Sequence, residues 1–188
     1  TENNQIQFVG NSSTAEGRAG VMHGIISNVS SNPQVTVNII SHSGMDYGYP
    51  AIAYTGTAAT DDNAMIVMDH SSDTVKPGTS AIFYKGGKYS DIVRLKQGES
   101  FIQVSSTSER WGDYSGAQRE YSKPGQVWCA GTYGIVKKLG PGSSLFTFAT
   151  WIAAVVDPYS TIASLKEIPN ATVQEVSVYP SPVLRSSP

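Results

Sequence analysis

The stretch RWGDYSGAQREYSKPGQVWCAGTYG (110–134) mixes aromatic residues with glycines and contains one Pro-Gly step. Aromatic and β-branched residues favour strands. Glycine and Pro-Gly steps allow the chain to bend tightly. This stretch therefore predicts a short strand, a sharply bent loop, and a second strand that ends in small residues.

The same pattern continues along the rest of the chain. Apolar runs of β-branched and aromatic residues alternate with Gly, Pro, Asn, Asp and Ser, which is typical of strands and turns. Gly86-Gly87 is a two-residue hairpin signal. No segment has a sustained helical period, so we predict an all-β fold. The expected strands lie near residues 5–9, 18–27, 34–41, 50–55, 63–69, 79–85, 89–95, 100–104, 126–133 and 145–155.

A weak internal repeat is visible when two parts of the chain are aligned. Residues 5–41 look like the later strands of an earlier unit. Repeats of this length with three or four strands each are typical of β-propeller blades. We therefore expect a partial β-propeller of about two and a half blades, while a closed propeller needs about four to eight. The missing blades would come from a longer protein or from another chain. The aligned segments are 49–54, 63–72 and 79–84 against 110–116, 125–134 and 144–155.

Composition narrows the class of protein. Charged residues make up 15 % of the chain and the net charge is −2, so no field would attract nucleic acid or an anionic membrane. Solubility through hydroxyls and amides instead of charge is common in extracellular β proteins. The one cysteine, Cys129, is expected to be a small buried residue on a strand. No apolar run approaches the length of a membrane-spanning helix.

The end of the chain has a different composition. Five of the prolines lie from Pro158 to Pro188, around the short apolar alternation VQEVSVYP (173–180). We expect a domain boundary between residues 156 and 157. A C-terminal linker would follow it, and then the first strand of another unit.

Several of these motifs resemble a known family. RWGDYSG (110–116) and PGQVWCAGTYG (124–134) resemble the last blade of secreted sialidase-like β-propellers from Bacteroidetes. Residues 6–11, 17–27, 49–54 and 63–72 look like the preceding blades, so the resemblance covers roughly residues 5–156. The shared motifs imply a structural scaffold and do not identify a reaction. The function it implies is a non-catalytic binding or structural module, outside the cell or on its surface.

Two shorter motifs imply export. VSVYPSPV (176–183) resembles the start of the C-terminal sorting domain of the type IX secretion system, with Tyr179, Pro180 and Pro182 at its motif positions and Ser181 where the family has Asn. This implies contact with the type IX machinery and a secreted or outer-surface location. Asp73-Thr74-Val75 resembles the O-glycosylation site of Bacteroidetes and marks Thr74, where the alternative is a plain turn.

A sialidase-like glycoside hydrolase is the alternative function. Such an enzyme would need an arginine triad, a tyrosine nucleophile and acidic helpers. The arginines are numerous enough, but no Asp-box sequence (Ser-x-Asp-x-Gly-x-Thr-Trp) occurs, and no catalytic residue is assigned here. The catalytic residues would lie mostly outside this sequence. The arginines are Arg18, Arg94, Arg110, Arg119 and Arg185.

The candidate ligand-binding residues are Arg110, Asp113, Tyr114 and His70. The first three surround the bend at Gly112, and His70 follows an expected strand. For Asp113 the alternative is a cap on the backbone of that bend. Trp111 and Trp128 are expected to pack between neighbouring blades.

Asp61 and Asp62 offer closely spaced oxygen ligands and so a calcium site, although the EF-hand spacing is not met. The alternative is a polar turn. No other cofactor is expected. The predicted partners are a glycan, a cell-surface protein, another copy of the chain, or the missing blades.

Overall fold

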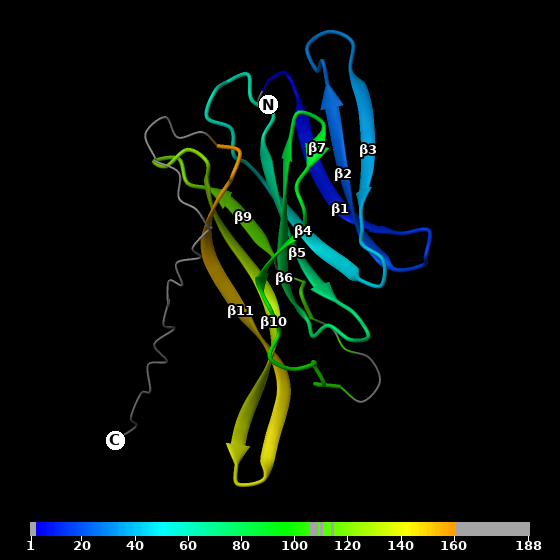
Figure 1. Cartoon of the computed structure of the whole chain (residues 1–188), viewed down its shortest axis with the longest axis vertical. Helices are drawn as coiled ribbons and strands as arrows, with labels where there is room; N and C mark the ends of the chain where they lie inside the picture. The colour runs from blue at the N-terminus through cyan, green and yellow to red at the C-terminus, as the bar shows by residue number, and fades with distance from the viewer. Residues whose placement is uncertain (1–2, 106–108, 110, 114, 161–188) are drawn as a thin grey trace, which may run out of the picture.

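The computed structural model describes residues 3–105, 109, 111–113 and 115–160. These residues form three antiparallel sheets, each built from strands that are consecutive in sequence (Figure 1). Sheet 1 contains β1 (Ile6–Ser13), β2 (Ala19–Ser27) and β3 (Gln34–Ile40). Sheet 2 contains β4 (Asp46–Tyr54), β5 (Ala64–Ser71), β6 (Gly78–Lys85), β7 (Lys88–Tyr89) and β8 (Val93–Lys96). Sheet 3 contains β9 (Gly116–Arg119), β10 (Gln126–Gly140) and β11 (Ser143–Val156).

The three sheets form a stack with sheet 2 in the middle. The first strand of each sheet lies next to the first strand of the neighbouring sheet, because β1 contacts β4 and β4 contacts β9. From this line the strands follow one another outward in sequence order, β1-β2-β3, β4-β5-β6 and β9-β10-β11. The all-β prediction is confirmed, and none of the sheets closes on itself.

The strand β5 explains why sheet 2 lies in the middle. Its sequence AMIVMDHS begins with a continuous apolar run over residues 64–68, which suits a strand that is covered on both faces. Ile66 and Met68 belong to the cluster shared with sheet 1, and Met65 and Val67 belong to the cluster shared with sheet 3. Both faces of one strand therefore serve as core.

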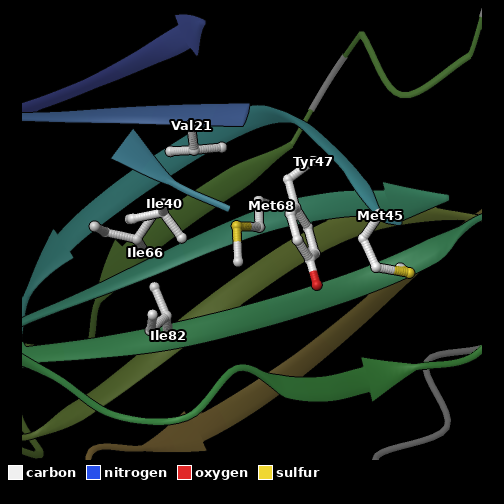
Figure 2. Packing of buried hydrophobic residues seen from close by; sticks show 7 residues of the cluster. All are labelled: Val21, Ile40, Met45, Tyr47, Ile66, Met68 and Ile82. Atoms are coloured by element: carbon white, nitrogen blue, oxygen red, sulfur yellow. The ribbon is translucent and has the colours of Figure 1, made fainter. Parts of the chain in front are cut away.

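Between sheets 1 and 2 the core consists of aliphatic, methionine and tyrosine side chains, shown in Figure 2. Val21 and Ile40 of sheet 1 meet Ile66, Met68 and Ile82 of sheet 2.

Between sheets 2 and 3 the side chains are smaller. Val127, Cys129 and Ala153 pack against Met65 and Phe83. The prediction for Cys129 is confirmed, since the residue lies on β10, is buried, and its pKa is raised to about 11 by that burial.

Some details of the strand prediction were wrong, and the expected strand near 89–95 is divided between β7 and β8. Residues 100–104 form no strand; instead Ile102 is buried and the Phe101 ring stacks on Phe146. A short strand was expected within residues 110–134 but was given no bounds, because GAQR, which forms β9, lacks an apolar alternation. The hairpin at Gly86-Gly87 is confirmed by the pairing of Lys85 with Lys88. The described part of the chain has no helix long and apolar enough to cross a bilayer.

The two end faces of the stack carry many apolar side chains, and no described sheet packs on either of them, although Phe101 stacks on Phe146 at the outer face of sheet 3. Cross-strand partners share a face of a sheet, so the register identifies the side chains on the outer face of sheet 1 as Ile6, Phe8, Met22, Val35, Val37 and Ile39. The same reasoning identifies those on the outer face of sheet 3 as Trp128, Ala130, Phe148, Ile152, Ala154 and Val156. Trp128, which was expected to pack between neighbouring blades, lies on the outer face of sheet 3, where no described sheet covers it.

Candidate functional site

A backbone irregularity in β4 marks the point where the three sheets meet. Tyr49 has a φ of 50°, and the register of β4 against β5 shifts between Gly48 and Ala51. A positive φ is uncommon for a bulky residue and needs support from its surroundings. The backbone N–H of Tyr49 donates to Asn11 Oδ1 of sheet 1 at 2.7 Å, and its carbonyl accepts from Ser115 Oγ, just before β9. Sheets 1 and 3 therefore both brace this bulge of sheet 2.

Gly112 lies against the bulge at Tyr49. Gly112 has a φ of +78°, and a Cβ there would lie 2.8 Å from both Asp69 Oδ2 and a ring carbon of Tyr49. Only glycine fits this conformation and this space. Asp113 follows it, half-buried and with partners of its own. The predicted ligand residues Arg110 and Tyr114 lie outside the described residues, so the grouping of these side chains stays a prediction.

Asp69 connects sheet 2 to sheet 3. Its side chain is 2 % exposed, and Oδ1 accepts hydrogen bonds from Thr132 N at 3.0 Å and from Thr79 Oγ1 at 3.2 Å. No described group is bonded to the buried Oδ2. Burial raises the pKa of Asp69 to about 7, against the lowering by its hydrogen bonds. The buried Asp69 carboxyl thus links its own strand β5 to β6 and β10 through hydrogen bonds.

A second buried carboxyl connects the same two sheets elsewhere. Asp157, just after β11, accepts hydrogen bonds from Thr55 Oγ1 after β4 and from Tyr159 N at 2.7 Å. Burial raises its pKa as well.

The interface between sheets 1 and 2 holds two buried histidines. His23 Nε2 lies 3.1 Å from Gln7 Oε1 and Nδ1 lies 2.7 Å from Tyr89 Oη. Since Gln7 Nε2 donates to Asp62 O, Gln7 Oε1 is the acceptor, so His23 is a neutral ring that donates through Nε2 and accepts from tyrosine. Burial lowers its pKa to about 4.

His70, a predicted ligand residue, is also buried. Its Nδ1 lies 2.8 Å from Ser80 Oγ, and its Nε2 has no bonded partner among the described groups. Burial, helped by the positive charge of Arg94, lowers its pKa to about 4. The side chain is enclosed in the protein and does not face an external ligand.

The candidate calcium residues cap turns. Asp61 Oδ2 accepts hydrogen bonds from the backbone N–H groups of Thr57 and Ala58, which lower its pKa. The Asp62 carboxylate accepts from Gly86 N at 2.9 Å. Each carboxylate thus supports a nearby loop.

Two of the candidate arginines have structural partners. Arg18 forms ion pairs with Asp46 at 2.8 Å and with Asp73 at 3.0 Å. The Arg119 guanidinium lies over the Tyr54 ring at 4.8 Å. Both arginines therefore hold together segments that are far apart in the chain.

Thr74, the candidate glycosylation site, is exposed in a turn after β5, where its N–H donates to Ser72 Oγ. That geometry suits a plain turn and leaves the hydroxyl accessible. The sorting motif residues Tyr179, Pro180 and Pro182 lie outside the described residues, and so does most of the expected linker.

The sequence did not indicate the residues that carry this site. Asn11, Tyr49, Asp69, Ser115 and Asp157 lie far apart in the chain, and only the stacking of the sheets brings them to shared interfaces. The one local signal was Gly112. Comparison with known proteins found no matching family model, no matching curated protein and no matching solved structure.

Proposed function

We propose that this chain is a non-catalytic binding or structural module, namely a part of a sialidase-like β-propeller that the type IX system exports to the outer surface of a Bacteroidetes cell. Further sheets, from a longer polypeptide or from another chain, would complete the ring. The observation that carries the proposal is the stack itself. Its first strands lie side by side, as they do around a propeller axis, and both its end faces carry many apolar side chains.

The use of the titratable side chains supports a structural role. Asp69, Asp157, His23 and His70 are all buried between sheets, where their hydrogen bonds join strands. A glycosidase acid needs a raised pKa and access to the sugar. Asp69 has the raised pKa but is buried, so it suits a structural hydrogen-bonding role and not that of an acid catalyst.

The ligand is proposed to be a glycan or a cell-surface protein. Loops at the end of a stack of sheets can vary in sequence while the sheets stay fixed. Binding of the full-length natural protein to a glycan array, with no sugar released from a panel of sialosides, is the expected result. Release of sugar would instead establish the glycoside hydrolase, with its catalytic residues elsewhere in that protein.

Export can be tested separately. In the full-length protein, replacement of Tyr179 and Pro180 by alanine is expected to leave the protein inside a type IX-competent cell, while Val183→Ala should not. Unchanged export of the double variant would contradict the sorting role of VSVYPSPV.

A further inference from the structure

We propose that a cavity beside the start of β1 and the end of β4 is a sugar-binding site, and that it takes the terminal residue of a neutral glycan. The inference rests on the proposed function, in which the chain binds a glycan. It goes further because it names the site and the class of sugar.

The cavity lies where sheets 1 and 2 meet, since β1 contacts β4. Its volume is about 240 Å³. Pockets for drug-sized ligands usually have roughly 300–1,000 Å³, so this cavity suits a smaller ligand, of the size of a single sugar ring. Its lining residues are Gln5, Ile6, Gln7, Ile52, Tyr54, Asp61, Asp62 and Ala64.

One part of the lining is apolar and another part accepts hydrogen bonds. Ile52, Ala64 and the ring of Tyr54 come from β4 and β5. The C–H faces of a sugar ring pack on such apolar and aromatic surface. Asp61 and Asp62, from the loop between these strands, supply carboxylates, which only accept hydrogen bonds when ionised. Sugar hydroxyls can donate to them. A few polar groups on an apolar wall are the usual composition of a small-molecule site.

Two acceptor atoms of the lining residues have no donor among the described residues. Asp61 Oδ2 accepts from the backbone N–H groups of Thr57 and Ala58, but Asp61 Oδ1 accepts from no described group. Gln5 Oε1 is buried, and it too lacks a described partner. A buried polar atom without a partner calls for an explanation such as a bound water or ligand. Sugar hydroxyls would supply the donors that both atoms lack.

Hydrogen bonds within the protein hold the lining in place. Gln7 Nε2 donates to Asp62 O at 2.8 Å, and Gly86 N donates to the Asp62 carboxylate at 2.9 Å. The Tyr54 hydroxyl donates to Ala58 O at 2.7 Å. These bonds connect the loop to β1, to β4 and to the turn after β6. A ligand would therefore not have to order the loop, which lowers the cost of binding.

The charges at the cavity favour a neutral sugar. Among the described residues that line it there is no lysine, arginine or histidine. An anionic sugar would lie against two carboxylates of like charge, which repel it. Backbone hydrogen bonds lower the pKa of Asp61, so its carboxyl is ionised at neutral pH. Lys85, whose charge acts on Asp61, donates to Tyr159 O and is not part of the lining.

An organic cation is disfavoured for a different reason. The Arg119 guanidinium already lies over the Tyr54 ring at 4.8 Å and would repel a second positive charge at that ring. A neutral polyol avoids both repulsions. The site would thus exclude sialic acid, although the sequence resembles sialidase-like proteins.

The test is the binding of methyl glycosides of neutral hexoses, and of N-acetylneuraminic acid, to the full-length natural protein by isothermal titration calorimetry. At least one neutral glycoside should bind, with or without EDTA, and N-acetylneuraminic acid should not. Asp61→Asn keeps an acceptor for the loop but removes the charge, and should weaken binding about tenfold. Ile6→Trp fills the cavity from a position that is 40 % exposed and should abolish binding. Asp91→Asn, at an exposed carboxyl outside the cavity, is the matched control and should bind as wild type does.

Thermal melts establish that each variant is folded, and Asp61→Asn alone decides the site if Ile6→Trp is not. Unchanged affinity for a neutral glycoside in the folded variants would overturn this site and leave the glycan-binding function standing. Loss of binding in EDTA would overturn direct recognition by the carboxylates. Binding of N-acetylneuraminic acid that Asp61→Asn weakens would overturn the class of sugar. A wild-type protein that bound no neutral glycoside would overturn the inference, and a glycan array without signal would then also overturn the glycan as the ligand.

Discussion

The two internal interfaces of the stack use opposite chemistry. Between sheets 1 and 2 the buried titratable groups include the histidines His23 and His70, with pKa values lowered to about 4. Between sheets 2 and 3 they include the carboxyls Asp69 and Asp157, with raised pKa values. In both cases burial favours the neutral form. The comparison shows how one physical cause can give two neighbouring interfaces opposite responses to pH.

The signs follow from proton binding. A histidine whose pKa falls from 6.5 to about 4 on folding contributes stability above pH 6.5 and loses it as the pH falls towards 4. A carboxyl whose pKa rises from 3.8 to about 7 contributes stability at low pH and loses it as the pH rises towards 7. Acid therefore weakens the first interface, and neutral pH weakens the second.

The largest expected effect tests whether the two apolar cores are equal. Met65 and Met68 are both fully buried on β5, one facing each interface. Met65→Ala and Met68→Ala should each lower the free energy of unfolding by about 2–5 kcal/mol, from lost burial and the cavity left behind. Urea denaturation measures this. If one of them left stability unchanged, the interface it faces would not be part of the folded core.

The second prediction concerns the close approach of sheets 2 and 3. A Cβ at Gly131 would overlap the Thr79 side chain and lie 2.9 Å from Asp69 Oδ1, so Gly131→Ala should cost about 1–3 kcal/mol. Gly116→Ala on β9 is the matched control, since a Cβ there meets nothing within 4 Å. Equal melting temperatures for the two variants would argue against this close contact.

The third prediction separates the interfaces by pH. Asn at position 69 keeps an oxygen for Thr132 and Thr79 but does not titrate. The stability of Asp69→Asn relative to wild type should therefore rise by roughly 1–2 kcal/mol between about pH 4 and pH 7. Thermal melts across that range provide the measurement. If the stability difference between the variant and wild type did not change with pH, Asp69 would have an ordinary pKa and would not be a buried carboxyl that links the sheets.

The smallest expected effect is the opposite trend at the other interface. His70→Asn retains a partner for Ser80 and removes the titrating ring. Its stability relative to wild type should rise by roughly 1 kcal/mol as the pH is lowered from about 6.5 to about 4. Thermal melts in acid serve here. A constant difference would mean that His70 has an ordinary pKa and is in contact with solvent, and a difference that fell in acid would mean that folding raises its pKa.

Many of the strands could be predicted from the sequence, because the local pattern of apolar and polar residues indicates where strands form. The runs that became β3, β5 and β6 alternate or are continuously apolar, and the pairing across Gly86-Gly87 follows from glycine alone. The segment 100–104 has the composition of a strand, but its residues pack individually, Phe101 on Phe146 and Ile102 inward.

The candidate site could not be predicted from the sequence, because its residues come together only when the sheets stack. The bulge at Tyr49 depends on Asn11 and Ser115, which lie 38 and 66 positions away in the chain. A buried carboxyl such as Asp69 cannot be told from an exposed one by its neighbours in sequence. The repeat, by contrast, aligned β5 with β10 and β6 with β11, although it set residues 110–116 against β4, where the structure has β9 at Gly116–Arg119.

Structure determination of the assembled protein at side-chain resolution, inspected at Val37 and Ile152, decides whether the stack is one arc of a ring. We predict that another sheet covers both side chains, with its strands following the same outward order. Both side chains in solvent, or three sheets rearranged into a self-contained sandwich or barrel, would contradict it.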